Sequence, residues 1–319
     1  MQCIVEITTD VCSNPDEIYN DLRPKLDMAI EYANNSGIEL LSMPIHPFSK
    51  VSDQSVSNDK RYTQFLDRMQ WPLRRLLITG IHVHVGVESG EKAIAIINGM
   101  KRYIPYFIAL SANSPYFESE NTGLASTRTK IFEGLPNTGI PERLRNYSEF
   151  QKFMRTLIRA NSIDSIREIW WDIRPHPGYG TVEIRICDSV PNLRDVKDFT
   201  ALCQALVVGL SRHYDNGTQL PYLDNWILYE NKWRATRYGI DADLIMDEDG
   251  SQIPIKDEII NTINNLSDEI NELNIGSCMD RLLGRIKSGH AYYKNQIKIF
   301  NQNKDLRDVI SNDLDILKQ

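Results

Sequence analysis

The chain has 319 residues, of which 41% are hydrophobic and 25% charged, and its net charge is −7. This composition is typical of a soluble globular protein with a sizeable core. The acidic balance excludes a general nucleic-acid-binding surface. No apolar stretch is long enough to span a membrane. Because there is also no repeat or low-complexity linker, we expect a single domain over residues 1–319.

The cysteines indicate the cellular compartment in which the protein is expected. Five of them are scattered without a C-x-x-C pair, at Cys3, Cys12, Cys187, Cys203 and Cys278. An odd number with this scatter is typical of reduced thiols in a cytoplasmic protein. The first residues, MQCIVEITTD, also lack the basic region and apolar run of a signal peptide.

The N-terminal part is predicted to hold strand and helix in turn. Cys3–Thr9 alternates and reads as a strand that begins almost at the first residue. Asn14-Pro15-Asp16-Glu17 predicts a helix start with a cap, a proline and acids in the first turn, and the pattern continues to about Asn35. Pro24 lies inside that pattern, where proline kinks or splits a helix. We next expect a short strand over Ile38–Met43, a polar loop over Ser55–Arg61 and a helix over Tyr62–Leu77.

Gly80–Gly86 reads GIHVHVG and is predicted to be a strand. Side chains alternate along a strand, so His82 and His84 share one face and Val83 and Val85 the other. Two imidazoles on one strand face are suited to binding a metal ion or a phosphate. The His-x-His spacing is not specific by itself, since several unrelated metal hydrolases use it.

The middle of the chain contains a predicted central helix, Glu91–Leu110, and then a small, polar segment, Ser111–Lys130. Such a segment either covers a site or is simply exposed to solvent. Arg128 within it is a candidate for binding a substrate carboxylate as a fork. Phe132–Pro141 is predicted to be a loop, and Ser148–Ala160 a helix capped by Ser148.

Ile169–Asp188 is predicted to form two antiparallel strands joined by the turn-forming residues 175–180. The second strand alternates strictly, so its apolar residues form a core face. The other face carries Glu183 and Arg185, and we expect Arg174 and Asp172 to extend it on the first strand. A charged face of this kind is either a functional site or an ordinary solvated surface.

The remainder is predicted to be mainly helical, with helices over Leu193–Tyr214 and Leu223–Tyr238. Arg234 and Arg237 lie one turn apart on the second of these, either on a solvated helix face or at a site. A small hairpin over Asp241–Ile255 and further helices over Lys256–Gln319 complete the expected elements.

Four blocks, in this order, resemble a known family: GIHVHVG, LSANSPY…TGLAS-x-R, WWDIRPH…GTVEIR-x-x-D and N-x-x-RA-x-RYG. The chain is similar over essentially its whole length to carboxylate–amine ligases related to bacterial type 2 glutamate–cysteine ligases. The resemblance implies an α+β fold similar to the glutamine synthetase catalytic domain. In that fold one face of an antiparallel sheet carries metal and phosphate ligands, and the other face packs on helices. It also implies a homodimer.

The resemblance further implies that ATP phosphorylates a substrate carboxylate, usually the side chain of glutamate, and that an amine, usually that of cysteine, attacks the acyl phosphate. Mg²⁺ or Mn²⁺ and arginines would neutralise the developing charge. The partners are then small molecules, without nucleic acid or membrane. The implied metal ligands are Glu6, His82 and Glu183, the implied catalytic and ATP-binding residues are His84, Arg174 and Arg185, and the implied substrate-binding residues are Arg128 and Arg237.

One departure concerns the N-terminus. In the family, a strand with an E-x-E pair of metal ligands precedes the one that matches Cys3–Thr9, and this sequence starts after it. We therefore expect the domain to lack its first strand. A misassigned start, a truncation and a shortened paralogue are three explanations, and an interior strand at the start of the chain favours the first two.

Three functions are consistent with these patterns. The leading one is a ligase that forms gamma-glutamylcysteine. The alternative is a catalytically weakened paralogue that binds nucleotide or amino acid. A metal-dependent hydrolase built on His-x-His is the third, but it would need more histidines than the sequence plausibly supplies, and it leaves Arg128, Arg174 and Arg185 unexplained.

Overall fold

The fold is described from a computed structural model, which covers residues 2–55 and 60–319. Helices dominate and surround a small antiparallel sheet, so the predicted α+β class is confirmed. The strands are β1 (Gly80–Gly86), β2 (Tyr116–Phe117), β3 (Glu120–Asn121), β4 (Thr138–Gly139), β5 (Trp170–Trp171), β6 (Ile173–His176), β7 (Thr181–Asp188), β8 (Asp243–Ile245) and β9 (Gln252–Pro254).

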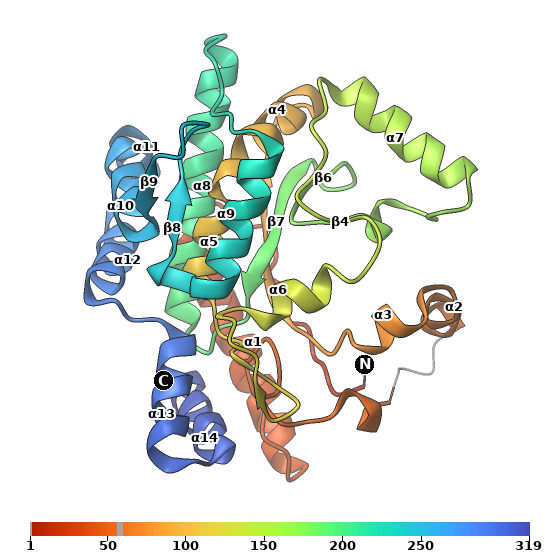
Figure 1. Cartoon of the computed structure of the whole chain (residues 1–319), viewed down its shortest axis with the longest axis vertical. Helices are drawn as coiled ribbons and strands as arrows, with labels where there is room; N and C mark the ends of the chain where they lie inside the picture. Colours follow the sequence, from red (N-terminus) through yellow and green to blue (C-terminus); the bar gives the residue numbers. More distant parts are fainter. Residues whose placement is uncertain (1, 56–59) are drawn as a thin grey trace.

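The helices account for most of the chain (Figure 1). They are α1 (Pro15–Asn35), α2 (Lys60–Met69), α3 (Trp71–Arg74), α4 (Gly90–Met100), α5 (Ile104–Ser111), α6 (Thr127–Phe132), α7 (Tyr147–Arg159), α8 (Leu193–Asp215), α9 (Asn225–Tyr238), α10 (Ile255–Asn265), α11 (Ser267–Glu272), α12 (Gly276–Ser288), α13 (Tyr292–Asn303) and α14 (Leu306–Leu317). No helix within the described ranges is long and apolar enough to cross a membrane.

The central sheet has the strand order β1-β7-β6, and both pairings are antiparallel. The predicted hairpin is therefore confirmed, with its turn at residues 177–180. The predicted first strand of the hairpin is divided at Asp172. The part before that residue, β5, pairs in parallel with β4 instead.

One face of this sheet is apolar and fully buried. Val182, Ile184 and Ile186 of β7 are at most 2% exposed, as the alternation predicts. Helices α4, α5 and α8 pack against the sheet, and α10 to α12 lie outside them (Figure 1). The burial of so much apolar surface fixes which way β7 faces, because a slip of one residue would turn its charged side chains into the core.

Two predicted strands are wrong. Cys3 lies in a turn and residues 4–9 have no regular secondary structure, and Ile38–Met43 likewise forms no strand. The alternating pattern was present at Cys3–Thr9, but a strand also needs a partner edge to satisfy its backbone groups. Thr8 instead accepts a hydrogen bond from Lys25 Nζ at 3.0 Å, and Asp10 N donates to Asp21 at 2.8 Å, so the segment runs along α1.

Several helix boundaries differ from prediction. The expected helix over Glu91–Leu110 is divided into α4 and α5 by a 3₁₀ turn, and Pro105 lies in the first turn of α5, where its missing N–H costs nothing. Helix α7 is capped by Asn146, not by Ser148. Helix α1 continues through Pro24.

The remaining predictions for the first half of the chain have mixed outcomes. The expected helix over Tyr62–Leu77 is present as α2 and α3, with a break at Gln70. The predicted loop Ser55–Arg61 falls on residues 56–59, which lie outside the described residues. Ser111–Lys130 is not a solvent-exposed loop: it contains β2, β3 and the start of α6, and most of it is buried.

Candidate active site

Glu183 is the centre of the charged face of the sheet. It lies in the middle strand, β7, where His84 of β1 is its partner on one side and Arg174 of β6 its partner on the other. Cross-strand partners on one face are close enough for their side chains to interact. The three strands therefore bring together most of the residues that the alternation placed on one face, with Asp172 as the exception.

Two arginines hold the Glu183 carboxylate. Arg174 donates from Nε to Oε2 at 2.6 Å and from Nη2 to Oε1 at 3.3 Å. Arg185 donates from Nη1 to Oε1. Arg174 is itself fixed by hydrogen bonds from its Nη1 to the carbonyls of Ile166 and Ile169, at 2.8 and 2.6 Å. The side chains of Arg174, Arg185 and Glu183 are 6%, 11% and 2% exposed, so the ion cluster is largely shielded from water.

The two histidines of β1 lie at the rim of this ion cluster. His82 Nδ1 and His84 Nε2 are 3.8 and 3.7 Å from Glu183 Oε1. His82 Nδ1 is also 3.4 Å from Arg185 Nη1, so it faces a donor and serves as an acceptor there. Both rings are about one-third exposed and reach solvent.

The pKa values follow from burial and these neighbours. Burial alone raises the pKa of Glu183, but Arg185 and Arg174 outweigh it and lower the pKa to about 2. Loss of hydration and the nearby Arg185 lower the pKa of His82, and loss of hydration lowers that of His84. Both imidazoles are therefore neutral at pH 7. With two guanidiniums and one carboxylate, the cluster carries one excess positive charge.

The turn between β6 and β7 adds an aromatic wall. The rings of His176 and Tyr179 are stacked with centroids 4.3 Å apart, and the His84 ring is edge-on to both, at 5.4 and 5.5 Å. His84 Nδ1 is 2.9 Å from the Thr181 hydroxyl, which fixes the ring orientation. Tyr179 is 71% exposed, so this wall opens to solvent.

The predicted metal set Glu6, His82 and Glu183 is not brought together. Glu6 is exposed in the N-terminal segment, outside any strand. The described part of the chain contains no group of three or more His, Cys, Asp or Glu placed to hold a metal ion. Magnesium prefers six oxygen ligands, whereas this cluster offers one carboxylate that two cationic guanidiniums already contact. This donor set fits an anion and does not fit a divalent cation.

The two predicted substrate-binding arginines lie in different surroundings. Arg128 is 3% exposed, and its terminal nitrogens donate to the carbonyls of Ile186 and Arg185, both at 3.1 Å. The expected open fork for a substrate carboxylate is therefore not what the structure shows. Arg237 is exposed on α9 with its guanidinium 5.0 Å from the Tyr238 ring centroid, and its role stays a prediction.

Sequence reasoning missed a buried hydrogen-bond cluster at the end of β7. The buried Asp188 carboxylate accepts hydrogen bonds from Asn113 N at 3.0 Å, Ser114 Oγ at 2.8 Å and Ser126 Oγ at 2.9 Å. Burial raises its pKa, opposed by Arg128 and these donors. The signal was present as small polar residues in Ser111–Lys130 together with an aspartate closing an apolar strand, but their distance in sequence concealed it.

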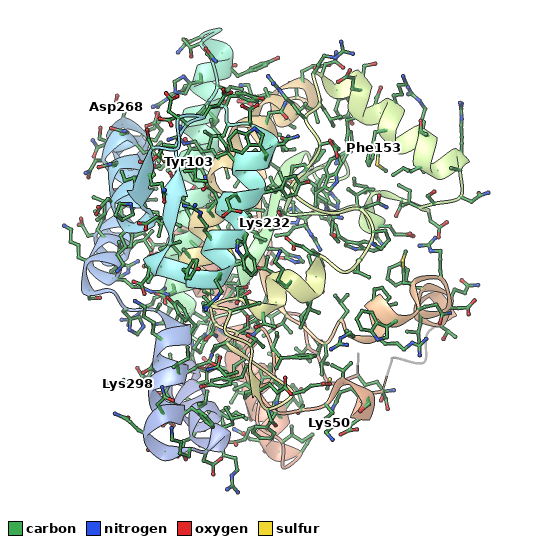
Figure 2. The ribbon with its side chains drawn as sticks, viewed as in Figure 1. Lys50, Tyr103, Phe153, Lys232, Asp268 and Lys298 are labelled. Atoms are coloured by element: carbon green, nitrogen blue, oxygen red, sulfur yellow. The ribbon has the colours of Figure 1, made fainter. Side chains whose placement is uncertain are left out.

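A second buried ion cluster was also missed. Asp172, expected on the Glu183 face, instead binds Lys232 Nζ of α9 at 2.6 Å, and Glu133 contacts the same nitrogen at 2.7 Å. Figure 2 shows Lys232 on α9 in the middle of the molecule. The backbone carbonyl of Asp172 accepts a hydrogen bond from the backbone N–H of Arg185 at 2.8 Å, which connects β7 to the residue just before β6. On the same helix, Arg234 donates from Nη1 to the Asp243 carbonyl at 3.1 Å and so connects α9 to β8.

Comparison with known proteins connects this arrangement to a family. The family described as glutamate-cysteine ligase family 2 matches residues 1–305. A relative from Thermobifida fusca, provisionally named glutamate–cysteine ligase 2, is 41% identical over 97% of this chain and 77% of its own length. One from Frankia casuarinae, provisionally named glutamate–cysteine ligase 2-1, is 40% identical over 96% of this chain and 80% of its own.

Two solved structures share the fold. A glutamate–cysteine ligase from Francisella tularensis in complex with AMP has a TM-score of 0.60 and 13% identity, over 88% of this chain and 73% of that one. The Pup ligase PafA in complex with ADP has a TM-score of 0.54 and 13% identity, over 97% of this chain and 65% of that one. At this identity the likeness concerns the fold, and it confirms the predicted architecture.

Proposed function

Since the chain belongs to glutamate-cysteine ligase family 2, we propose that it is an ATP-dependent ligase that joins a carboxylate to an amine. The substrates we propose are glutamate, through its side-chain carboxylate, and cysteine, through its amine. The names of the relatives support this pair, and the nucleotides bound to the two solved neighbours support ATP as the third substrate.

The observation that carries the proposal is the charge of the Glu183 cluster. Two buried guanidiniums and one carboxylate leave an excess positive charge, and two neutral imidazoles stand beside it. Guanidiniums bind phosphate oxygens through paired, charge-assisted hydrogen bonds. The cluster is therefore suited to the negative charge that builds up when a phosphoryl group moves between two oxygens.

In the proposed reaction a carboxylate oxygen forms a bond to the γ-phosphorus of ATP, and the bond to the β-phosphate oxygen breaks to release ADP. The amine then attacks the acyl carbon, phosphate leaves with the bonding electron pair, and the nitrogen loses a proton. Arg185 and Arg174 offset charge on the transferring group. Glu183 keeps both guanidiniums aligned, and the neutral imidazole of His84 is available to contact a phosphate oxygen.

A second candidate is a relative that binds nucleotide with weak turnover. It is favoured by one observation: the described residues of the cluster supply a single carboxylate, Glu183, and Glu6 lies in the exposed segment outside the sheet. We assign no step to a protein-held metal, because the donor set does not fit one.

ADP release separates the two candidates. With purified protein and ATP, we expect ADP to form only when glutamate and cysteine are both present, and each is omitted in turn as a control. ATP binding by calorimetry without ADP formation would favour the second candidate. A panel of other amino acids in place of cysteine then identifies the amine.

Glu183→Gln tests the cluster directly. The amide keeps the shape of the side chain but no longer holds two guanidiniums, so we expect turnover to fall by about 100-fold or more. Glu120→Gln, on the exposed strand β3, is the matched control and should leave turnover unchanged. A Glu183→Gln enzyme with near-normal turnover would remove the cluster from the reaction.

A further inference from the structure

The pairing of β1 with β7 contains a β-bulge at the active site. Gly80 and Ile81 pair with Asp188 and Cys187, whereas Val83 and His84 pair with Ile184 and Glu183. Two residues of β7, Arg185 and Ile186, therefore lie opposite the single residue His82. A bulge leaves backbone groups unpaired and re-aims a side chain. Arg185 lies within this bulge, and its side chain contacts Glu183 and His82.

Arg128 satisfies the carbonyls of that bulge. Its Nη1 donates to the Ile186 carbonyl and its Nη2 to the Arg185 carbonyl, each at 3.1 Å. These are the two residues that the bulge sets opposite His82, and buried carbonyls without a partner cost free energy. The guanidinium matches two adjacent carbonyls because its donors form a rigid fork.

The surroundings of Arg128 are shaped for this contact. A Cβ placed on Gly80 would lie inside van der Waals distance of the guanidinium, so any other residue there would push the guanidinium from its present position. The Arg128 guanidinium carbon is 5.6 Å from the Phe132 ring centroid, and the Arg128 backbone N–H donates to Ser114 Oγ at 3.2 Å. Ser114 in turn donates to Asp188, the partner of Gly80, so the Asp188 end of the bulge is anchored as well.

We propose that Arg128 is a positioning residue, which holds the β7 bulge and so aims Arg185 at Glu183 and His82. This replaces the expectation that Arg128 binds a substrate carboxylate. The expected effect of Arg128 on turnover rests on the proposed ligase activity. Its expected effect on the structure of β7 does not. Arg128 touches no reacting group; it acts through the backbone of the residue that does.

The kinetic test compares Arg128→Met with Arg145→Met, since Arg145 is an exposed arginine before α7. A misplaced Arg185 should lower kcat by about 100-fold, because small displacements of a catalytic group cost that much. The KM for the carboxylate substrate should change by less than about threefold, since no substrate contact is lost. Arg128→Lys, which keeps the charge but has a single donor nitrogen in place of the fork, should retain more activity than Arg128→Met. Arg145→Met should match the wild type.

Hydrogen exchange supplies a readout that needs no turnover. In Arg128→Met and in Gly80→Ala, amides of residues 181–188 should exchange faster by mass spectrometry, while those of α8 stay unchanged. A KM that rises more than about tenfold with unchanged exchange would show a substrate clamp and overturn the proposal. Unchanged kcat and exchange in folded variants that are only less stable would also overturn it. If the wild type has no ligase activity, unchanged exchange alone decides against the bulge role.

Discussion

At the scale of single residues, two buried carboxylates change the pH dependence of stability in opposite directions. Glu183 is held by two guanidiniums, which keep its pKa at about 2. Asp313 of α14 is 1% exposed and its Oδ2 has no hydrogen-bond partner, so burial raises its pKa to about 7. Folding therefore favours the charged form of one acid and the neutral form of the other.

Lowering the pH should lower the free energy of unfolding through protonation of Glu183. Because its pKa falls from 4.5 to about 2 on folding, the stability that it contributes is present above about pH 4.5 and is lost as the pH falls through about 2. The loss is on the order of 3 kcal/mol. Urea unfolding of wild type and Glu183→Gln at pH 6 and pH 3 measures it. The stability difference between the two proteins should shrink at pH 3, and a constant difference would contradict the ion pairing.

Asp313 should have the reverse effect. Its folded pKa of about 7 exceeds the usual 3.8, so its protonated form stabilises at low pH and stability falls as the pH rises from about 4 to about 7. Asp313→Asn should therefore raise the free energy of unfolding at pH 8 by about 4 kcal/mol. Asp315→Asn, exposed on the same helix, is the control. Equal melting temperatures for Asp313→Asn and wild type at pH 8 would contradict this.

The residues of the active-site face could be predicted because a strand has a simple period. His82, His84, Glu183 and Arg185 were placed correctly from alternation alone. The bulge could not be predicted, because it shifts the pairing register of β1 and β7 by one residue and leaves the alternating sequence pattern of β7 unchanged. Neither could the Asp188 and Lys232 clusters, because each joins residues that only the folded chain brings together.

At the scale of elements, helix α9 ends at a glycine that no other residue can replace without cost. Gly239 has φ +57° and ψ −128°, a backbone conformation that L side chains rarely adopt. A Cβ there would also lie 2.5 Å from the ring of Tyr293, whose hydroxyl donates to the Tyr238 carbonyl at 2.9 Å. This glycine therefore lets α13 pack against the end of α9.

Gly239→Ala should lower the free energy of unfolding by about 3 kcal/mol, from backbone strain and the clash together. Gly250→Ala provides the matched control, because Gly250 has φ +81° in the β8–β9 turn and no atom within 4 Å of a Cβ. It carries strain alone and should cost about 1 kcal/mol. Equal losses in urea unfolding would show that the contact with Tyr293 contributes nothing.

Helices were predicted better than strands for a physical reason. A helix satisfies its own backbone, so the cap at Asn14 and the apolar stripe of α8 were sufficient signals. A strand depends on a partner that can be far away in sequence. Cys3–Thr9 has the pattern without the partner, and β4 and β5 have a partner without a long pattern.

At the scale of the whole molecule, the assembly state stays a prediction. The resemblance implies a homodimer, and we expect light scattering after gel filtration to give twice the chain mass of 36.7 kDa. The mass should persist on dilution to the concentration used for ADP assays. A single-chain mass at that concentration, with full activity, would show that the monomer is the working form.

The long connections through Asn113 bear on how the chain folds during synthesis. Its backbone N–H reaches Asp188, 75 residues later, and its carbonyl accepts from Gln296, 183 residues later. Such closures cost conformational entropy before their contacts compensate, so they form late. All the side chains of the Glu183 cluster leave the ribosome well before α13 does. A chain that is still being synthesised would thus carry all the reactive groups before α13 has packed against Asn113. The active site would become rigid only in the last stage of folding.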